Sequence, residues 1–318
     1  MVSPVAAVVV AYRSGACLER CLDSLAGRVA EVAVVDNCPE ERSGRGLRGR
    51  YPSAAWIQND RNLGFAAACN QGVAATRAPF VLLINPDCEL LEGLEHLVRA
   101  CQEAGVAGAG GVLIDPDGRP QTGFFARSLP TPAALALEAV GANRLWPQNP
   151  VNRRYRMLNM RLGEDCDVGQ PAGAFLLLRR ACLSSVGGFD EAFRPVWFED
   201  VDLCTRLSDE GYRFRYVPAA VARHDGGHSV ATLGEGQKLA GWYGGLLRYA
   251  RKHFPRGAGI WVRAAVVAGL GLRAVSWWRP SGSNERASAH LAMLFRVLRG
   301  YPRQPDARAR AEPRATRP

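Results

Sequence analysis

The regular alternation of apolar runs and amphipathic segments up to residue 115 is the feature that most constrains this fold. The apolar runs have the length and β-branched content of buried strands, and the segments between them repeat apolar or small residues at helical spacing. The expected strands cover residues 5–12, 31–37, 54–60, 79–87 and 107–115, and the expected helices cover 18–25, 65–77 and 90–101. This alternation predicts an α/β fold with a mostly parallel sheet that carries helices on both faces.

The pattern changes after residue 118. Residues 119–165 are rich in Pro, Asn and Arg, and we expect a long, mobile excursion there with one short helix near 131–140. Regular structure is expected again as a strand at 173–180, a helix around 200–210, a strand at 212–218 and helices from 235 onward. The sequence thus predicts one domain over 1–230, a helical C-terminal extension over 231–300 and a disordered basic tail over 301–318.

The net charge of +10 is concentrated near the C-terminus. From Gly244 onward, fifteen Lys and Arg stand against three acidic residues, a net +12 that leaves −2 for the first 243 residues. This distribution argues against a uniformly basic nucleic-acid-binding protein and suggests an anionic membrane surface or a polyanion as the partner of the extension. Nine cysteines without a CxxC pair, and an N-terminus that reads as a strand rather than a signal peptide, predict a reduced, cytoplasmic protein.

Residues 259–278 form an apolar stretch that is long enough to cross a bilayer. Arg263 and Arg273 interrupt it, and each would cost about 2.5–3.5 kcal/mol near the bilayer centre. Tryptophans near its ends suit an interfacial position. We therefore expect a helix that lies on the membrane surface, with a buried core helix as the open alternative.

Polar residues follow several of the predicted strands, at the sheet edge where ligands of such folds bind. Asp36 could accept hydrogen bonds from a nucleoside or could cap a turn, and Gly64 precedes a helix whose N-terminus favours phosphate. Asp87, in the turn "NPD", could hold Mg²⁺ or Mn²⁺ together with substrate phosphates, although Asn-Pro-Asp is also a common turn. His224 and His228 lie in the glycine-rich stretch "RHDGGHS".

The stretch "VWFEDVDLCTR" places three carboxylates directly after an apolar run. Glu199, Asp200 and Asp202 could complement the dipole of a helix that starts there. Alternatively, one of them could be a general base whose pKa is tuned by the neighbouring Trp197 and Phe198. We expect both, with Asp200 as the base and Asp202 as a helix cap.

The order of these motifs over about residues 4–230 resembles family 2 glycosyltransferases, most closely the bacterial rhamnosyltransferase-like members. The segments concerned are Tyr12, Asp36-Asn37, "NLGFAAACNQG", "LLINPD", "AGAFLLLRR", "VGGFDEAF", "WFEDVDLCTRL" and "RHDGGHS". The resemblance implies a GT-A nucleotide-diphospho-sugar transferase fold, with a C-terminal helical extension added to it. It also implies inverting transfer from a nucleotide sugar.

The resemblance also implies roles for individual residues. The donor would be bound by Tyr12, Asp36, Asn37, Asn62, Gly64, Asn85 and Asp87; a Mg²⁺ or Mn²⁺ ion by Asp87 and His224; and the acceptor by Gly173, Asp190 and Trp197. Asp200 would be the catalytic base, with Glu199 beside it. Two positions depart from the family pattern, since Asn85 replaces the first acid of the DxD motif and Arg13 replaces a frequent Asn.

The expected function is the transfer of a sugar to a hydroxyl group of a glycan or lipid-linked acceptor in cell-envelope polysaccharide synthesis. L-Rhamnose from dTDP-rhamnose is the leading donor, followed by UDP sugars, and the expected location is the inner face of the cytoplasmic membrane. A homodimer is left open. The alternatives are a non-catalytic sugar-nucleotide-binding protein and a nucleotidyltransferase, although "AYRSGACLER" lacks the repeated glycines of a nucleotidyltransferase phosphate loop.

Overall fold

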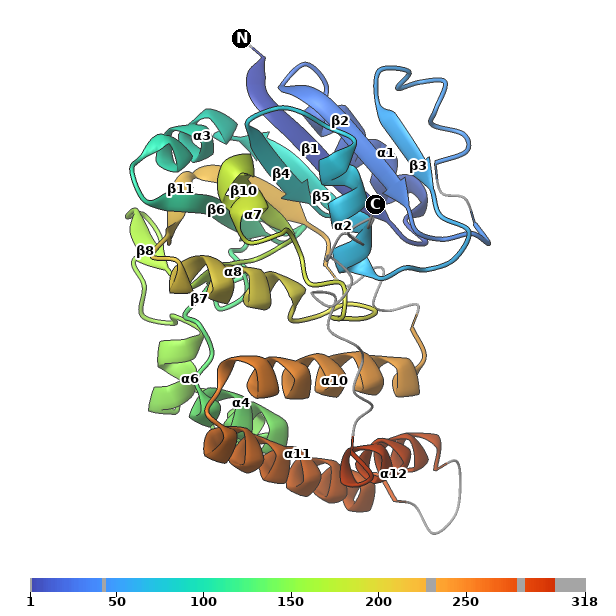
Figure 1. Ribbon diagram of the computed structural model, residues 1–318, viewed down its shortest axis with the longest axis vertical. Coiled ribbons are helices and arrows are strands. Elements are labelled where there is room, and N and C mark those ends of the chain that lie inside the picture. The colour runs from blue at the N-terminus through green and yellow to red at the C-terminus, as the bar shows by residue number, and fades with distance from the viewer. Residues whose placement is uncertain (1, 42–43, 227–232, 279–283, 301–318) are drawn as a thin grey trace, which may run out of the picture.

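The computed structural model describes residues 2–41, 44–226, 233–278 and 284–300. A twisted sheet with helices packed on both faces forms one part of the molecule, and a layer of long helices lies beneath it (Figure 1). The two predictions that concern residues 301–318 and His228 lie outside the described residues.

The main sheet has the strand order β3-β2-β1-β4-β10-β6-β11-β5, and β8 pairs with β11. β1 to β4 form a parallel block, β6 is parallel to β11, and β10 runs antiparallel to both of its neighbours. The strands are β1 (Ser3–Ala11), β2 (Val29–Asp36), β3 (Ala55–Gln58), β4 (Phe80–Ile84), β5 (Cys88–Glu92), β6 (Val106–Ile114), β7 (Ala126–Arg127), β8 (Cys166–Val168), β9 (Gln170–Pro171), β10 (Phe175–Arg179) and β11 (Arg213–His224). The predicted α/β architecture is confirmed.

The helices that cover the sheet are α1 (Gly15–Leu25), α2 (Phe65–Ala74), α3 (Leu94–Gln102), α7 (Arg180–Ser185) and α8 (Glu199–Asp209). Their apolar faces and the central strands enclose the main core, in which β1 and β4 are buried along almost their whole length. This continuous burial explains why both strands read as uninterrupted apolar runs.

One predicted helix boundary was wrong. Leu90 and Leu91 belong to strand β5, and helix α3 begins only at Leu94. Burial alternates along β5, with Cys88 and Leu90 facing the core. The sequence prediction therefore mistook the two-residue periodicity of a strand for helical periodicity. Gly93 separates the two elements at φ 80°, where an added Cβ would overlap the backbone oxygen of Ala219.

The prediction of a long, mobile excursion over 119–165 was also wrong. The segment contains α4 (Pro132–Val140), α5 (Ala142–Leu145) and α6 (Pro150–Tyr155), of which only the first was expected. Thr131 caps α4 by accepting a hydrogen bond from the Ala134 N–H (3.2 Å), and Gly141 ends the helix at φ 84°. Leu135 and Ala139 then bury themselves against the C-terminal helices, which supplies the packing that orders the segment.

The C-terminal helices α10 (Glu235–His253), α11 (Arg256–Ser276) and α12 (Glu285–Leu298) form a second core. α10 lies between α8 and α11, and α11 also packs on α4 and α12 (Figure 1). Phe198 from the start of α8 and Val266 from α11 are buried in the same cluster. By length and composition, α11 could cross a membrane, but 28% of its apolar window is buried inside the protein.

Candidate active site

A cavity of about 410 Å³ lies between the sheet and the C-terminal helices, and both Asp87 and Asp200 line it. Residues from the ends of β1, β2 and β4 form one side, and the segment that enters α8 forms the other. The predicted site residues at the lining are Tyr12, Asn37, Asn62, Asn85, Asp87, Gly173, Trp197, Glu199, Asp200 and His224. Segments that are far apart in the sequence thus meet at one concave site.

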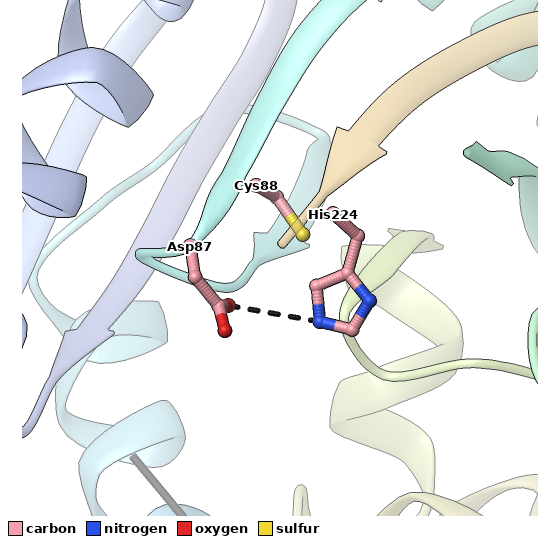
Figure 2. Close-up of side chains that lie close together, drawn as sticks. All are labelled: Asp87, Cys88 and His224. Atoms are coloured by element: carbon pink, nitrogen blue, oxygen red, sulfur yellow. Dashed lines mark ion pairs between the residues drawn. The ribbon is translucent and has the colours of Figure 1, made fainter. Parts of the chain in front are cut away.

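The register between two strands brings Asp87 and His224 together. His224, the last residue of β11, lies opposite Cys88, the first residue of β5, and the Asp225 N–H donates to the Asp87 carbonyl (3.0 Å). The imidazole Nε2 of His224 then lies 3.7 Å from Oδ1 of Asp87 (Figure 2). Ligand atoms of Asp87, Cys88 and His224 lie within 4.8 Å of one another, close enough to hold a metal ion.

Gln121 determines which nitrogen of His224 faces Asp87. The side-chain amide of Gln121 donates from Nε2 to the His224 carbonyl (2.8 Å), which orients its Oε1 toward Nδ1 of the imidazole at 2.9 Å. Nδ1 must therefore carry the proton, and the lone pair of Nε2 points toward Asp87. This is the tautomer in which an imidazole can bind a cation.

The donor set suits a cation that prefers oxygen and imidazole ligands. Burial lowers the pKa of His224, although the charges of Asp87 and Asp225 oppose the shift, and the imidazole is therefore neutral. Burial raises the pKa of the Cys88 thiol, whose Sγ lies 3.4 Å from the Ala174 carbonyl, so the thiol stays protonated. A carboxylate and a neutral imidazole fit Mn²⁺ or Mg²⁺.

A network of asparagines shapes the loop before α2 at the edge of the cavity. The Asn37 side chain donates to Asn62 Oδ1 (2.9 Å) and accepts hydrogen bonds from Asn59 Nδ2 and the Leu63 N–H, both at 3.0 Å. Asn62 also accepts from the Gly64 N–H (2.9 Å). These contacts hold the segment before α2 in place at the edge of the sheet.

Two residues predicted to bind the donor lie behind this surface. Asp36 is buried and accepts hydrogen bonds from the N–H groups of Cys38 (3.1 Å) and Gly44 (3.3 Å), so it stabilises the turn after β2. Gly64, at φ 88°, also lies outside the cavity lining. Arg13 does not line the cavity and stacks over the ring of Tyr12 at 5.5 Å.

Asp200 is held in place by the segment of residues 170–173 and by the next residue of its own helix. Its Oδ2 accepts hydrogen bonds from Gln170 Nε2 (2.7 Å) and the Gly173 N–H (3.2 Å), while Oδ1 accepts from the Val201 N–H (2.8 Å). A Cβ on Gly173 would lie 3.1 Å from Oδ2, so glycine allows this close approach. The carboxylate is thus held in a fixed orientation at the cavity wall.

Glu199 has a different environment from Asp200. Its side chain is only 4% exposed, and its Oε2 has no hydrogen-bond partner among the described residues. Burial, and then the charge of Asp200, raise the pKa of Glu199 well above its usual value. The raised pKa favours the protonated form of Glu199, in which its carboxyl group can donate a hydrogen bond.

Trp197 and Phe198 form the apolar wall in a strained backbone conformation. Their φ angles are 82° and 73°, values that bulky residues rarely adopt. Two glycines of α10 make room for them, because a Cβ on Gly241 would lie 2.8 Å from the Trp197 ring and one on Gly245 would lie 2.8 Å from the Trp197 carbonyl. α10 thus holds the wall beside Asp200.

The prediction that Asp202 caps helix α8 was wrong. Its fully buried carboxylate pairs with Arg206 (2.8 Å) on its own helix and with Lys252 and His253 (both 2.7 Å) on α10. The predicted acceptor residue Asp190 lies outside the cavity lining and pairs with the same Lys252 at 2.7 Å. Both acids therefore connect the sheet domain to the C-terminal helices.

Several residues of this cavity were missed because they lie in the segment that the sequence left uninterpreted. They are Phe124, Arg127, Tyr155 and Arg156, and Gln170 was missed just beyond that segment. Arg127 stacks over the rings of Phe124 (5.7 Å) and Tyr155 (5.9 Å), which places positive charge at the cavity. No pattern in the sequence points to these positions, because tertiary packing alone brings them here.

Comparison with known proteins decides the family. The model of "Glycosyl transferase family 2" matches residues 6–175, more than half of the chain. The chain belongs to glycosyl transferase family 2. This family 2 protein is 34% identical over 239 residues to the N-acetylglucosaminyl-diphospho-decaprenol L-rhamnosyltransferase of Mycobacterium tuberculosis. The matched region covers 70% of this chain and 76% of the relative.

Solved structures establish the fold of this family 2 glycosyltransferase. GalNAc-T7 with UDP, GalNAc and Mn²⁺ has a TM-score of 0.55 at 13% identity, over 93% of this chain and 56% of that one. The mannosyltransferase PcManGT of Pyrobaculum calidifontis, in complex with GDP-Man and Mn²⁺, has a TM-score of 0.54 at 14% identity, over 94% of this chain and 88% of that one. The predicted GT-A fold and the resemblance to rhamnosyltransferase-like members are confirmed.

Proposed function

We propose that this glycosyltransferase transfers L-rhamnose from dTDP-rhamnose, with inversion, to a hydroxyl group of a lipid-linked glycan acceptor. The observation that carries the proposal is the single cavity that Asp87 and Asp200 share. The name of the mycobacterial relative, an L-rhamnosyltransferase acting on a diphospho-decaprenol glycan, supports the sugar and the acceptor class.

In this proposal, Asp87 and Nε2 of His224 would hold Mn²⁺ or Mg²⁺, and the bound ion would supply positive charge for the leaving nucleoside diphosphate. Tyr12, Asn37 and Asn62 bind the nucleoside on the same side of the cavity. Asp200 removes the proton from the acceptor hydroxyl as its oxygen attacks the anomeric carbon, and the diphosphate leaves from the opposite face of the sugar. Bond formation and cleavage on opposite faces invert the anomeric configuration.

The neighbours of Asp200 have defined roles in this mechanism. Gln170 and the Gly173 N–H orient the carboxylate so that it faces the acceptor rather than rotating freely. Protonated Glu199 donates a hydrogen bond to a sugar oxygen, which would satisfy its unpaired buried carboxyl group. Trp197 and Phe198 exclude water from the attacking oxygen.

We further propose that the protein binds the cytoplasmic face of the membrane through α11. Large apolar side chains of this helix face solvent, among them Ile260 (68% exposed), Trp261 (76%) and Val275 (77%). Arg263 donates to the Val297 carbonyl (2.7 Å) and Arg273 to the Ala139 carbonyl (2.6 Å). Because each guanidinium group is anchored to a carbonyl of a neighbouring helix, the exposed apolar side chains can enter the interfacial region while α11 stays docked on the protein.

The mechanism is tested with Asp200→Asn, which keeps the size of the side chain but cannot accept the proton. We expect transfer from dTDP-rhamnose to fall by about 10²- to 10⁴-fold, the usual contribution of a general base, while the Kd for the donor with Mn²⁺ changes less than about twofold. Asp209→Asn, an exposed position on the same helix, is the control. Near-normal turnover by Asp200→Asn would exclude Asp200 as the base.

A further inference from the structure

A second cavity, of about 320 Å³, lies in the C-terminal helical layer and is lined mainly by basic and aromatic side chains. Arg144, Lys238, Arg273 and Arg286 contribute four positive charges, against a single carboxylate from Glu235. The aromatic part includes tryptophans from the segment before α8, from α10 and from the end of α11. This composition differs from that of the first cavity, which holds the catalytic carboxylates.

The two cavities are neighbours. Trp197 and Trp242 line both of them, and their rings meet edge to face with centroids 6.0 Å apart. A molecule with its hydroxyl at Asp200 could therefore extend past these two rings into the second cavity. The first cavity, at about 410 Å³, is of a size that a nucleotide sugar and one acceptor sugar would fill, so the rest of a long acceptor needs another place.

The charges of the second cavity are available to an anion. In the described part of the chain, Arg144, Lys238 and Arg286 form no ion pair, and Arg286 packs over the Trp277 ring at 4.8 Å. Arg273 uses Nη1 for the carbonyls of Ala139 and Gly269, which fixes its position and leaves further N–H groups. Guanidinium and ammonium groups that converge in this way bind phosphate oxygens.

Exposed apolar side chains flank two of the lining residues of this cavity in the sequence. Val275 and Trp278 beside Trp277, and Leu145 and Trp146 beside Arg144, are all exposed. A ligand whose anionic group sits among the basic side chains could leave a hydrocarbon chain on these apolar side chains. Such a ligand has the chemistry of an isoprenoid or other lipid that carries a diphosphate.

We infer that the second cavity binds the diphosphate group of the lipid-linked acceptor, with the acceptor sugar passing Trp197 and Trp242 into the first cavity. The inference rests on the proposed function for the class of acceptor. It adds a binding site for that acceptor, built by α10, α11, α12 and the end of α5, and gives these helices a part in substrate recognition as well as in packing.

The test measures binding of radiolabelled farnesyl diphosphate to the full chain by equilibrium dialysis, without donor. EDTA is present so that metal-dependent diphosphate binding near Asp87 does not contribute. We compare Lys238→Gln/Arg286→Gln with the control Arg251→Gln/Arg296→Gln, which removes two exposed charges from the same two helices outside the cavity. We expect Kd to rise at least tenfold in the first double variant and less than about twofold in the control.

The alternative source of the phosphate chemistry is an anionic phospholipid headgroup. Soluble dihexanoylphosphatidylglycerol, added as a competitor, is expected to leave farnesyl diphosphate bound, and its full displacement of the probe would overturn the assignment. Equal losses in the two double variants, no loss in the cavity variant, or equally tight binding of farnesol would also overturn it. Since no donor is used, a failure of rhamnosyl transfer would reject the proposed function without deciding this binding result.

Discussion

Asp202→Asn tests the coupling between helix α8, which carries Asp200, and the C-terminal helices. The Asp202 carboxylate is fully buried and contacts Arg206, Lys252 and His253 at 2.7–2.8 Å. Burial alone would raise its pKa, but the hydrogen bond from His253 and the charges of Arg206 and Lys252 outweigh burial and lower the pKa from 3.8 to about 2. At about 1.4 kcal/mol per pKa unit, this difference corresponds to about 2.5 kcal/mol of stability at neutral pH.

The sign of this effect fixes its pH dependence. Because the pKa is lower in the folded state, the stabilisation is complete above about pH 4 and disappears as the pH falls through about 2. Urea unfolding at pH 7 should therefore show Asp202→Asn to be less stable than the native chain by at least about 2.5 kcal/mol, since the variant also leaves buried cations without their partner. The difference in free energy of unfolding between the native chain and Asp202→Asn should narrow below pH 4.

Asp209→Asn, at the exposed end of the same helix, is the control and should change stability by less than about 0.5 kcal/mol. A loss of stability in Asp202→Asn that is no larger than the loss in this control would refute the reasoning. If the difference in free energy of unfolding between the native chain and Asp202→Asn stays constant down to pH 2, the loss of stability comes from packing and not from the ionised carboxylate.

Three further perturbations follow from the structure. Gly93→Ala should lower stability by more than about 2 kcal/mol in thermal unfolding because its Cβ meets backbone, whereas Gly118→Ala, at a similar φ but in open space, should cost about 1 kcal/mol. Gln121→Leu should weaken Mn²⁺ activation by about 10- to 100-fold in a metal titration, because the imidazole of His224 loses the group that fixes its tautomer; unchanged activation would exclude that role. Trp261→Ser should lower co-sedimentation with phosphatidylglycerol vesicles by at least about threefold, and an unchanged bound fraction would contradict docking through α11.

The parts of the site that could be predicted from the sequence are those that follow strands. Tyr12, Asn37 and Asn85 come directly after β1, β2 and β4, and the carboxyl ends of neighbouring parallel strands meet at one edge of the sheet. The position of Asp200 at the same cavity required the motif order, because nothing local in "WFEDVD" shows which way the helix points. Its neighbour Asp202 was misassigned for the same reason, since its partners on α10 are about fifty residues away in the sequence.

The parts that could not be predicted depend on tertiary packing. Gln170, which orients Asp200, lies in a two-residue strand without a periodic pattern. Arg127 and Arg156 come from the 119–165 segment, in which α4 packs on α11, and α5 and α6 pack on α4, through contacts that no local signal reveals. Gln121 and His224 are about a hundred residues apart, and the pairing of β6 with β11, together with the turn that returns Gln121 to Leu113, brings them within hydrogen-bond distance.

A crystal structure of Asp200→Asn with intact dTDP-rhamnose and Mn²⁺ tests the central claim most directly. We predict that Mn²⁺ contacts Asp87 and His224 and bridges to the diphosphate, and that the anomeric carbon lies between the diphosphate and residue 200. A nucleotide bound away from Asp87, or a sugar whose leaving diphosphate is on the same side as residue 200, would contradict the account.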